Sequence, residues 1–469
     1  MKQPLHEVHR LRIPRRLGSS VWAHRDVRLL VPARALSLAG DGMALITLVL
    51  RLHDAGHGPA AVTGLFLCFT IPTVLTIGVA GQVVDTRDSR LVLGAATAVQ
   101  VLACVGLVFG GNLVATYGCV LLLQLGVAFS SPAWAALLPR IVGDEQLGRV
   151  VAWQQGLGAA TQPAGAALGG LLYGIFGSQV AFWCDAGTFA LLLVVALSVR
   201  TRRSPDEKAA GASRGDEPAA PNAAQVRRHG HRSLLGIRVL RADALLWPLF
   251  CALLPFILFV EGVNVVEVFL ARDALGASAA EYGLAEVAFG IGAVAGSVAA
   301  GRIEGDRRRA RVTLLGLGLT CLAVLGAGLA PTFSVYLVLA ILIGGMNTLA
   351  NAVSGALFMT RSPEHQRGRV SAALNGCARL ASTIALIAGG LVGTWLGPRP
   401  TFLLGGALGA AVTTAAALWL RIRIRHLTTD SADPRSTAGA HAPTAQFVSA
   451  IRQPRQNADG AAGTASEEA

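Results

Sequence analysis

Twelve apolar segments of about 20 residues each follow one another along the chain, and no other feature constrains its fold as strongly. A hydrocarbon core about 30 Å thick needs roughly 20 helical residues per crossing, and lipid offers the backbone no hydrogen-bond partners, so each crossing must be a helix. With 53% hydrophobic and 14% charged residues, the chain has too little polar surface for a soluble globule. We predict an all-α membrane protein with twelve transmembrane helices, at about residues 29–51, 59–80, 91–110, 114–138, 150–175, 179–199, 244–270, 280–301, 312–330, 333–359, 371–396 and 401–421.

A charged stretch rich in Pro, Ala and Gly separates the twelve segments into two sets of six. We predict a first six-helix half at 29–199, a cytoplasmic linker at 200–243 and a second six-helix half at 244–421. A polar tail of residues 1–28, which lacks the apolar core of a signal peptide, and a tail of residues 422–469 flank the two halves. The composition of the linker and of the C-terminal tail is typical of disordered segments.

The basic residues predict the orientation of the bundle. Of 40 Lys and Arg residues, Arg51, Arg272 and Arg399 fall in loops on one side, and Arg34 and Arg379 fall within helices. The other 35 lie on the opposite side, which the positive-inside rule assigns to the cytoplasm together with both termini. An arginine-rich, lysine-poor and alanine-rich composition is typical of a high-GC bacterium, so we expect a multi-pass protein of the bacterial plasma (inner) membrane.

The second half repeats the first at a constant offset of 220 residues. The matching positions are Gly81 with Gly301, Arg87 with Arg307, 148–150 (GRV) with 368–370, Gly156 with Gly376, and 169–171 (GGL) with 389–391. A run of matches in one register indicates a duplicated 6+6 architecture. Transporter folds are commonly built from such repeats, with the substrate site near the midplane where the halves meet.

Several other classes of function find no support. The basic residues flank apolar segments and form no stripe interleaved with aromatic residues, so nucleic-acid binding is not expected. The sequence has no phosphate-binding Gly-x4-Gly-Lys-Ser/Thr loop, no His-Glu-x-x-His pair and no Gly-x-Ser-x-Gly elbow, so we expect no enzymatic activity and no cofactor. The seven cysteines lack metal-ligand spacing, and we predict no metal site.

Residues 81–90 (GQVVDTRDSR), between the second and third predicted helices, resemble the loop motif Gly-x-x-x-Asp-(Arg/Lys)-x-Gly-x-Arg of the major facilitator superfamily. Gly81, Asp85 and Arg90 match the motif, whereas Thr86 and Asp88 depart from it. The segment 132–139 (PAWAALLP) is similar to the Pro-x6-Pro run of bacterial exporters of the enterobactin-exporter and macrolide-efflux type. The resemblance covers nearly the whole membrane part and implies the major facilitator fold and a monomer.

The loop motif implies a gating role. Asp85 can accept hydrogen bonds from a neighbouring helix N-terminus and pair with Arg87 or Arg90, which would hold the two halves closed on the cytoplasmic side. The alternative is that these charges only enforce the topology.

The fifth predicted helix carries residues 165–170 (GAALGG), which align with the antiporter-type motif Gly-Pro-x-x-Gly-Gly with alanine in place of proline. Pro163 can supply a kink instead. An equally good reading is that Gly165, Gly169 and Gly170 form a packing face of small residues.

Two acids at pseudo-equivalent positions are the first candidates for proton coupling or for binding a cationic substrate. Asp41-Gly42 in the first helix corresponds to Glu261-Gly262 in the seventh at the offset of 220. In the resembled fold, these two helices line the central cavity. A carboxyl group removed from water can exchange a proton near neutral pH as access alternates. The alternative is structural neutralisation, by Arg34 or Arg379.

Further polar residues within helices are weaker candidates. Asn264 and Glu267 share a helical face with Glu261, and Asp185 and Glu286 lie about two turns inside the outer boundary. In the eleventh helix Asn375 and Arg379 are four residues apart, and Asn375 matches Gln155 of the fifth helix at the same offset. For each of these residues, a solvated rim position, snorkelling or a polar contact between helices is the alternative.

These features favour a secondary transporter that exports a small amphipathic organic molecule, such as a drug, siderophore or natural product, by alternating access in exchange for protons. An importer or uniporter of a small solute is the first alternative. A membrane sensor or scaffold that does not transport is the second, and such a protein has no need for a wet acidic pocket.

Overall fold

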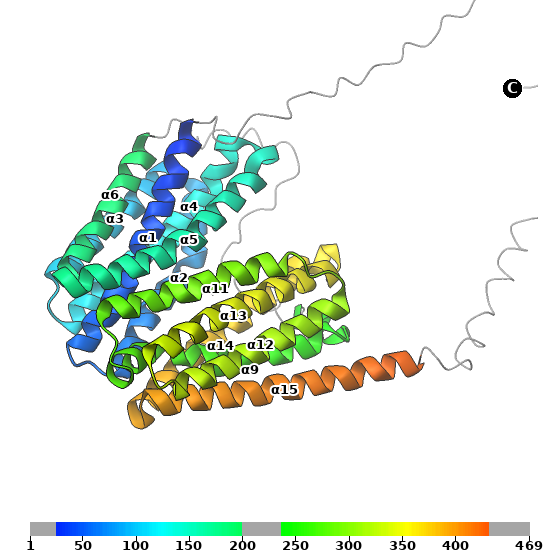
Figure 1. Cartoon of the computed structure of the whole chain (residues 1–469). Helices are drawn as coiled ribbons and strands as arrows, with labels where there is room; N and C mark the ends of the chain where they lie inside the picture. Colours follow the sequence, from blue (N-terminus) through cyan, green and yellow to red (C-terminus); the bar gives the residue numbers. More distant parts are fainter. Residues whose placement is uncertain (1–24, 199–235, 431–469) are drawn as a thin grey trace, which may run out of the picture. The chain divides into compact units, whose positions relative to one another are not determined.

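A computed structural model describes residues 25–198 and 236–430, all of whose regular elements are helices. The first half contains α1 (Arg25–Asp54), α2 (Pro59–Thr86), α3 (Ser89–Phe109), α4 (Leu113–Val142), α5 (Asp144–Phe176) and α6 (Ser178–Ser198). The second half contains α9 (Leu246–Val260), η2 (Glu261–Val265), α10 (Glu267–Phe269), η3 (Leu270–Ala274), α11 (Ala279–Ala300), α12 (Asp306–Leu329), α13 (Phe333–Arg361), η4 (Glu364–Gln366), α14 (Arg367–Leu396) and α15 (Pro398–Asp430). The predicted all-helical membrane fold is confirmed (Figure 1).

Within the described ranges, eleven of the predicted crossings coincide with helices long and apolar enough to span a membrane. The remaining crossing is α5, which has 33 residues and therefore sufficient length. Its central turns carry Gln154, Gln155 and Gln162, and these lower its hydropathy. Polar side chains therefore accumulate on α5, whose hydropathy is lower than that of the other predicted crossings.

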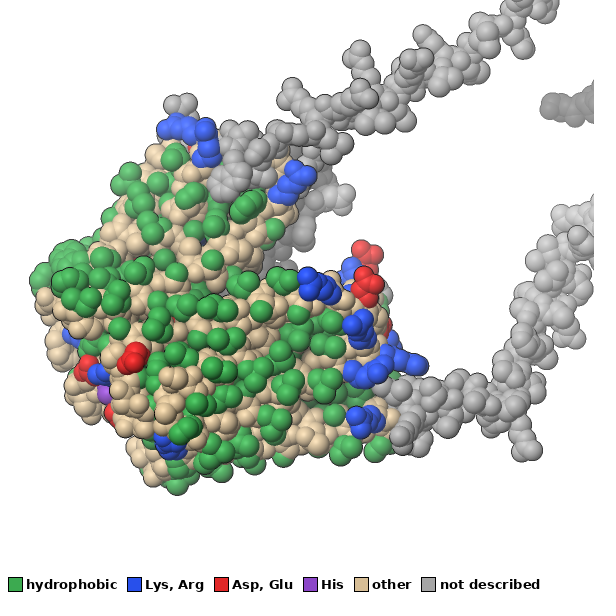
Figure 2. Space-filling model, viewed as in Figure 1, with side chains coloured by type: hydrophobic (Ala, Val, Ile, Leu, Met, Phe, Trp, Pro, Cys, Tyr) green, Lys and Arg blue, Asp and Glu red, His purple; other side chains and the backbone are tan. Residues whose placement is uncertain are grey.

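Lipid is the expected solvent for the sides of the helices. Large apolar side chains are strongly exposed there; for example Leu102 is 70% and Leu75 is 74% exposed. On the face seen in Figure 2, hydrophobic side chains spread over the flanks of the helices, whereas Lys and Arg gather towards their ends. We call the helix ends near Arg51, Arg272 and Arg399 the arginine-poor ends and the opposite ends the arginine-rich ends.

Glycines allow α1 to lie directly on α5. A Cβ atom at Gly42 would collide with the backbone of Gln162, one at Gly165 with Ala39, and one at Gly169 with Met43. Small residues of this kind let helix backbones touch in a membrane, where no hydrophobic force drives helices together. The packing reading of the Gly165–Gly170 motif therefore has a structural basis.

The same packing recurs in the second half at the offset of 220. A Cβ at Gly262 would collide with the backbone of Ala385, and one at Gly389 with Gly262, so η2 lies directly on α14. Gly262 and Gly389 are the repeat partners of Gly42 and Gly169. The internal repeat is therefore visible as a repeated helix contact.

The seventh predicted helix (244–270) is not one regular helix. It begins as α9, tightens to a 3-10 helix at η2, and widens to a π-helix at η3. Short 3-10 and π segments inside a membrane helix often mark functional sites. The change of winding starts at Glu261, the acid that the repeat singles out.

The two halves meet through two pairs of helices that the repeat also relates. Gly170 of α5 packs on Gly283 of α11, and Thr63 of α2 packs on Gly390 of α14. Thr63 Oγ1 donates a hydrogen bond of 3.3 Å to the Leu386 carbonyl oxygen. Because 63 and 283, and 170 and 390, are each 220 residues apart, this interface has the pseudo-symmetry of the sequence.

The predicted N-terminal tail (1–28), except for its last four residues, lies outside the described residues, as does most of the linker (200–243) and of the C-terminal tail (422–469). The end of the predicted linker is helical at residues 236–242. Residues 25–198 and 236–417 belong to one compact unit, and 418–430 are the described part of a second, the end of α15.

Gly389→Ala should lower the thermal unfolding midpoint of the detergent-purified protein. The new methyl group meets the Gly262 backbone, and overpacking of this kind costs about 1–3 kcal/mol, more than alanine gains over glycine in a helix. Gly376→Ala, in the same helix but with open space around it, is the matched control and should leave the midpoint unchanged or raise it. Equal effects of the two substitutions would contradict the packing described for α14.

Candidate functional site

A polar cavity of about 380 Å³ lies between α1 and α5. Arg34 lines it from α1, and Gln154, Gln155 and Gln162 line it from α5. Gln154 accepts a hydrogen bond of 2.9 Å from Trp134 Nε1, whereas Gln155 and Gln162 are exposed. We call this space the α1–α5 cavity; it offers one guanidinium and several amide groups to a ligand.

Asp41 continues the stripe of α1 that faces this cavity. Arg34 and Leu38 line the cavity, and residues at i, i+4 and i+7 lie on one face of a helix, so Asp41 follows Leu38 one turn further along. The Arg34 guanidinium is near enough to Asp41 for Coulomb attraction, but the two form no ion pair within 4.0 Å in the described part of the chain. Asp41 is half-buried and keeps its carboxyl group available.

Asp185 of α6 is an acid that interacts electrostatically with Asp41. Its side chain is fully buried and accepts hydrogen bonds from Cys104 Sγ at 3.2 Å and from Thr188 Oγ1 at 3.3 Å. Asp185 also packs on Gly40, the residue before Asp41, and its carboxyl group is near enough to that of Asp41 for a Coulomb interaction. The structure therefore brings together two acids that sequence analysis treated separately.

Glu261 has a different partner. Its half-buried carboxyl group accepts a hydrogen bond from the Ser382 hydroxyl of α14. Among the contacts of the described residues, neither Asp41 nor Arg379 is joined to Glu261. Ser382 is the repeat partner of Gln162, so Glu261 and Ser382 stand where Asp41 and Gln162 stand in the first half.

A second pair of acids lies in the second half. Glu267 accepts a short hydrogen bond of 2.6 Å from the buried Tyr336 hydroxyl and is in Coulomb contact with Glu286 of α11. Tyr282, also buried, lies in the electrostatic range of both acids. Glu267 is thus held by a buried phenol, which is the polar contact between helices among the alternatives given for it.

The remaining polar candidates lie on exposed helix faces. Asn375 and Arg379 on α14 are exposed, as is Gln155 at the repeat-related position on α5, and Asn264 of η2 is exposed as well. In the described residues, no direct contact links them to Asp41 or Glu261. Their role in binding stays a prediction.

The loop motif shows why one departure from the family pattern is tolerated. Asp88, where the motif has glycine, caps α3 by accepting a hydrogen bond of 3.0 Å from the Arg90 backbone N–H. Gly81 has open space around it, and Asp85 is half-buried at the end of α2. Whether Asp85 pairs with Arg87 or Arg90 to close the halves stays a prediction.

In the second half, an acid of the loop that corresponds to residues 81–90 at the offset of 220 has a clear partner. Asp306 pairs with Arg361 at 3.0 Å, and Arg361 also pairs with Asp243 at 2.7 Å. This three-residue network joins the starts of α9 and α12 to the end of α13. It lies within one half.

Pro163, which can supply a kink, lies inside α5, which extends from Asp144 to Phe176. Its ring packs on Gly290 of α11, where a Cβ would lie 2.8 Å from Pro163 Cγ. Pro163 therefore belongs to the interface between the halves.

An ionic network that sequence analysis missed joins the halves at the arginine-poor ends. His53 Nε2 lies 2.8 Å from Asp273 Oδ1, and Arg272 Nη2 lies 3.2 Å from Asp54 Oδ1. The Tyr173 hydroxyl donates a 3.0 Å hydrogen bond to Asp54. We call these five residues the latch. The available signals were the rare Arg272 and the offset of 220 that separates His53 from Asp273.

The other two arginines at these ends act within one half. Arg51 donates to the Leu107 carbonyl oxygen at 2.8 Å, and Arg399 donates to Gly328 and Ala330 carbonyl oxygens at 3.2 and 3.0 Å. Both therefore satisfy carbonyl groups at helix C-terminal ends.

The chain is similar to known proteins over most of its length. A family model described as "Major Facilitator Superfamily" matches residues 30–271 and 262–458. The chain is 26% identical over 365 residues to "Enterobactin exporter EntS" of Shigella dysenteriae serotype 1, covering 75% of this chain and 82% of that protein. It is 21% identical over 402 residues to "Macrolide efflux protein A" of Streptococcus pyogenes, covering 83% and 95%.

Among solved structures, a bacterial homologue of the iron transporter ferroportin in its inward-facing state is similar with a TM-score of 0.62. The sequence identity is 18%, and the match covers 84% of this chain and 98% of that chain. At this identity the likeness shows the fold alone.

Removing the latch should loosen the contact between the arginine-poor ends. Thr63, 8% exposed between α2 and α14, reports on this contact. In a background without the seven native cysteines, we expect Thr63→Cys to react slowly with a water-soluble maleimide, and several-fold faster after Arg272→Gln. The matched control is Arg399→Gln, which breaks hydrogen bonds within one half only. If Arg272→Gln leaves the labelling rate unchanged, the latch does not hold the halves together.

Proposed function

Because the chain belongs to the Major Facilitator Superfamily, we propose that it is a secondary active transporter that exports a small amphipathic organic molecule by alternating access in exchange for protons. The names of two similar proteins, an enterobactin exporter and a macrolide efflux protein, support export and a substrate of this class. The proposed route is the α1–α5 cavity together with the repeat-related face of α14.

The observation that carries this proposal is the position of Asp41. It shares a helical face with the residues of the polar cavity, and on its other side lies the fully buried Asp185. A membrane-embedded acid is costly, since charged residues at a helix centre cost about 2.5–3.5 kcal/mol on insertion scales, so it asks for a functional reason. An acid between a ligand cavity and a second acid is suited to exchange a proton when a ligand binds.

Protonation of the pair Asp41 and Asp185 would change the packing of α1. Asp41 stands between Gly40, which packs on Asp185, and Gly42, which packs on α5. Two ionised carboxylates in a low-dielectric site repel each other, and a proton taken up by the pair removes this repulsion. We propose that binding and release of this proton bias the contact of α1 with α5 and α6, and that this couples proton movement to the change of access.

The latch would close one side during this cycle. We propose that the arginine-rich ends face the cytoplasm, as the positive-inside rule requires, so the latch lies on the outer side. With the outer ends held together by ion pairs, the exposed Gln155 and Asn375 would face the cytoplasm and load substrate from there. Breaking of the latch would then accompany release outside.

Asp41→Asn should abolish substrate-dependent proton release from inside-out vesicles that contain the purified chain. Asparagine keeps the size and polarity of the side chain but cannot exchange a proton. The measurement is quenching of a pH-sensitive dye while macrolides, siderophores and organic cations are added in turn. Glu304→Gln, which neutralises an exposed acid between α11 and α12, is the matched control and should behave as wild type.

The outcomes separate the competing functions. Release of protons by wild type and not by Asp41→Asn supports antiport. If the Asp41→Asn variant still releases protons, Asp41 is not the residue that couples proton movement to transport. Substrate movement without proton release would favour a uniporter, and binding without movement would favour a sensor or scaffold.

Orientation has its own test in intact cells. In a chain without native cysteines, Gly111→Cys in the α3–α4 loop should react with a membrane-impermeant maleimide, because this exposed position lies at the arginine-poor ends. Glu304→Cys should react only after the cells are permeabilised. The reverse pattern would mean that the arginine-rich ends face outward.

A further inference from the structure

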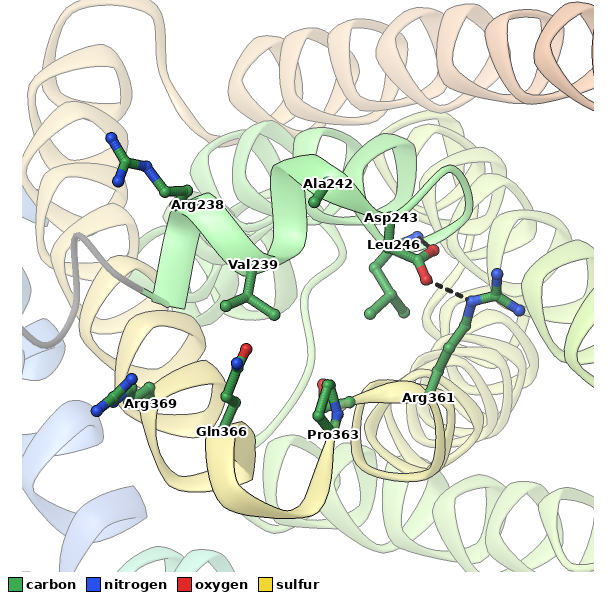
Figure 3. A pocket seen from close by; sticks show the side chains of 10 residues that line it. Arg238, Val239, Ala242, Asp243, Leu246, Arg361, Pro363, Gln366 and Arg369 are labelled. Atoms are coloured by element: carbon green, nitrogen blue, oxygen red, sulfur yellow. Dashed lines mark hydrogen bonds and ion pairs between the residues drawn. The ribbon is translucent and has the colours of Figure 1, made fainter. Parts of the chain in front are cut away.

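A cavity of about 510 Å³ opens at the arginine-rich ends of the second half, away from the α1–α5 cavity. It lies among the short helix of residues 236–242, the start of α9, the end of α13 and the start of α14 (Figure 3). None of its lining residues takes part in the transport route proposed above. The charged and apolar groups of this cavity are therefore separate from that route.

The cavity carries unbalanced positive charge. Arg361, one of its three arginines, is occupied by Asp243 at 2.7 Å and Asp306 at 3.0 Å. Arg238 and Arg369 are both exposed and have no hydrogen bond or ion pair from their side chains to other described residues. In Figure 3 Arg238 and Arg369 lie on opposite walls at one edge of the cavity, and both side chains run outward from it. Two guanidinium groups are thus available to an anion.

A buried hydroxyl without a partner lies in the same wall. Ser362, which lines the cavity, is 3% exposed, and its Oγ has no hydrogen-bond partner among the residues that the structure describes. A buried polar group left unpaired is costly, so its presence here points to a ligand that pairs with it.

The start of α14 adds to the attraction for an anion. The helix begins at Arg367 and runs for 30 residues, and its N-cap residue Gln366, a lining residue of the cavity, makes no side-chain cap. The N-terminal end of a long helix carries a partial positive charge and free N–H groups, and anions bind there.

Apolar side chains complete the cavity. Val239 and Leu246 face it beside the charged groups, which favours an amphipathic anion over a fully hydrated one. Trp247, adjacent to Leu246, stacks on Phe250 at 5.8 Å and lies under Arg241, and tryptophans are enriched at the membrane–water interface. Basic pockets between transmembrane helices at this depth suit lipid headgroups.

We propose that this cavity binds the headgroup of an anionic membrane phospholipid, with Arg238 and Arg369 at its rim and the Ser362 hydroxyl in its wall. The guanidinium groups at the rim contact the charged headgroup, the hydroxyl donates to one of its oxygens, and the apolar wall contacts the glycerol and the first acyl carbons.

The test is binding of fluorescent phosphatidylglycerol to the purified full chain in a neutral detergent. The double variant Arg238→Gln, Arg369→Gln should weaken binding about tenfold or more, since it removes two charge-assisted contacts. The matched control is Arg307→Gln, Arg308→Gln, which removes two exposed arginines at the start of α12 outside the cavity and should leave binding within about twofold of wild type.

Ser362→Ala separates binding from folding. Removing an unpaired buried hydroxyl should leave the thermal unfolding midpoint unchanged or higher in lipid-free detergent, while phosphatidylglycerol binds more weakly. Equal loss in both double variants, or no loss in the cavity variant, would overturn the site. Displacement of the lipid by inorganic phosphate or by phosphatidylcholine at similar concentrations would overturn the assignment to an anionic phospholipid.

Discussion

Backbone-to-backbone contact through glycine is the interaction on which the rest of the structure depends. In lipid, apolar side chains gain nothing by leaving the solvent, so helices associate through close packing. Here Gly42 and Gly262 occupy the repeat-related contacts of α1 with α5 and of η2 with α14. Asp41 and Glu261 directly precede them. The two acids therefore lie next to the points of each half at which helix backbones touch.

The positions of Asp41 and Glu261 could be predicted from the sequence, but the residues that contact them could not. The offset of 220 correctly marked Asp41 and Glu261 as equivalent positions, because duplication preserves position along a helix. It could not show that Asp41 lies by Asp185 and that Glu261 binds Ser382, since a partner depends on how adjacent helices are rotated. Residue spacing likewise placed Glu261 and Asn264 on one face but gave no sign of the 3-10 and π segments.

The number and order of the helices were predictable because the bilayer imposes their length and hydropathy. Their ends were less so: α2 was expected to stop at residue 80 and continues to Thr86, since a helix can extend past the hydrocarbon into water. The sequence could not show that Pro163 fits against Gly290 of the other half, because that contact depends on how the two halves meet. The latch was missed because its five residues come from three separate segments, α1, α5 and η3, and only their meeting in space gives them a role.

The separation of His53 from Asp273 by 220 residues has an evolutionary meaning. Two positions that correspond in a duplicated chain and also touch each other must lie on the pseudo-twofold axis that relates the copies. In a dimer of two separate, identical halves, the same side chain would occupy both positions, and two imidazoles or two carboxylates facing each other cannot form a salt bridge. Joining the halves into one gene lifts that restriction, because each copy can then mutate alone. The contact of His53 with Asp273 at the axis is therefore one that two identical halves could not form.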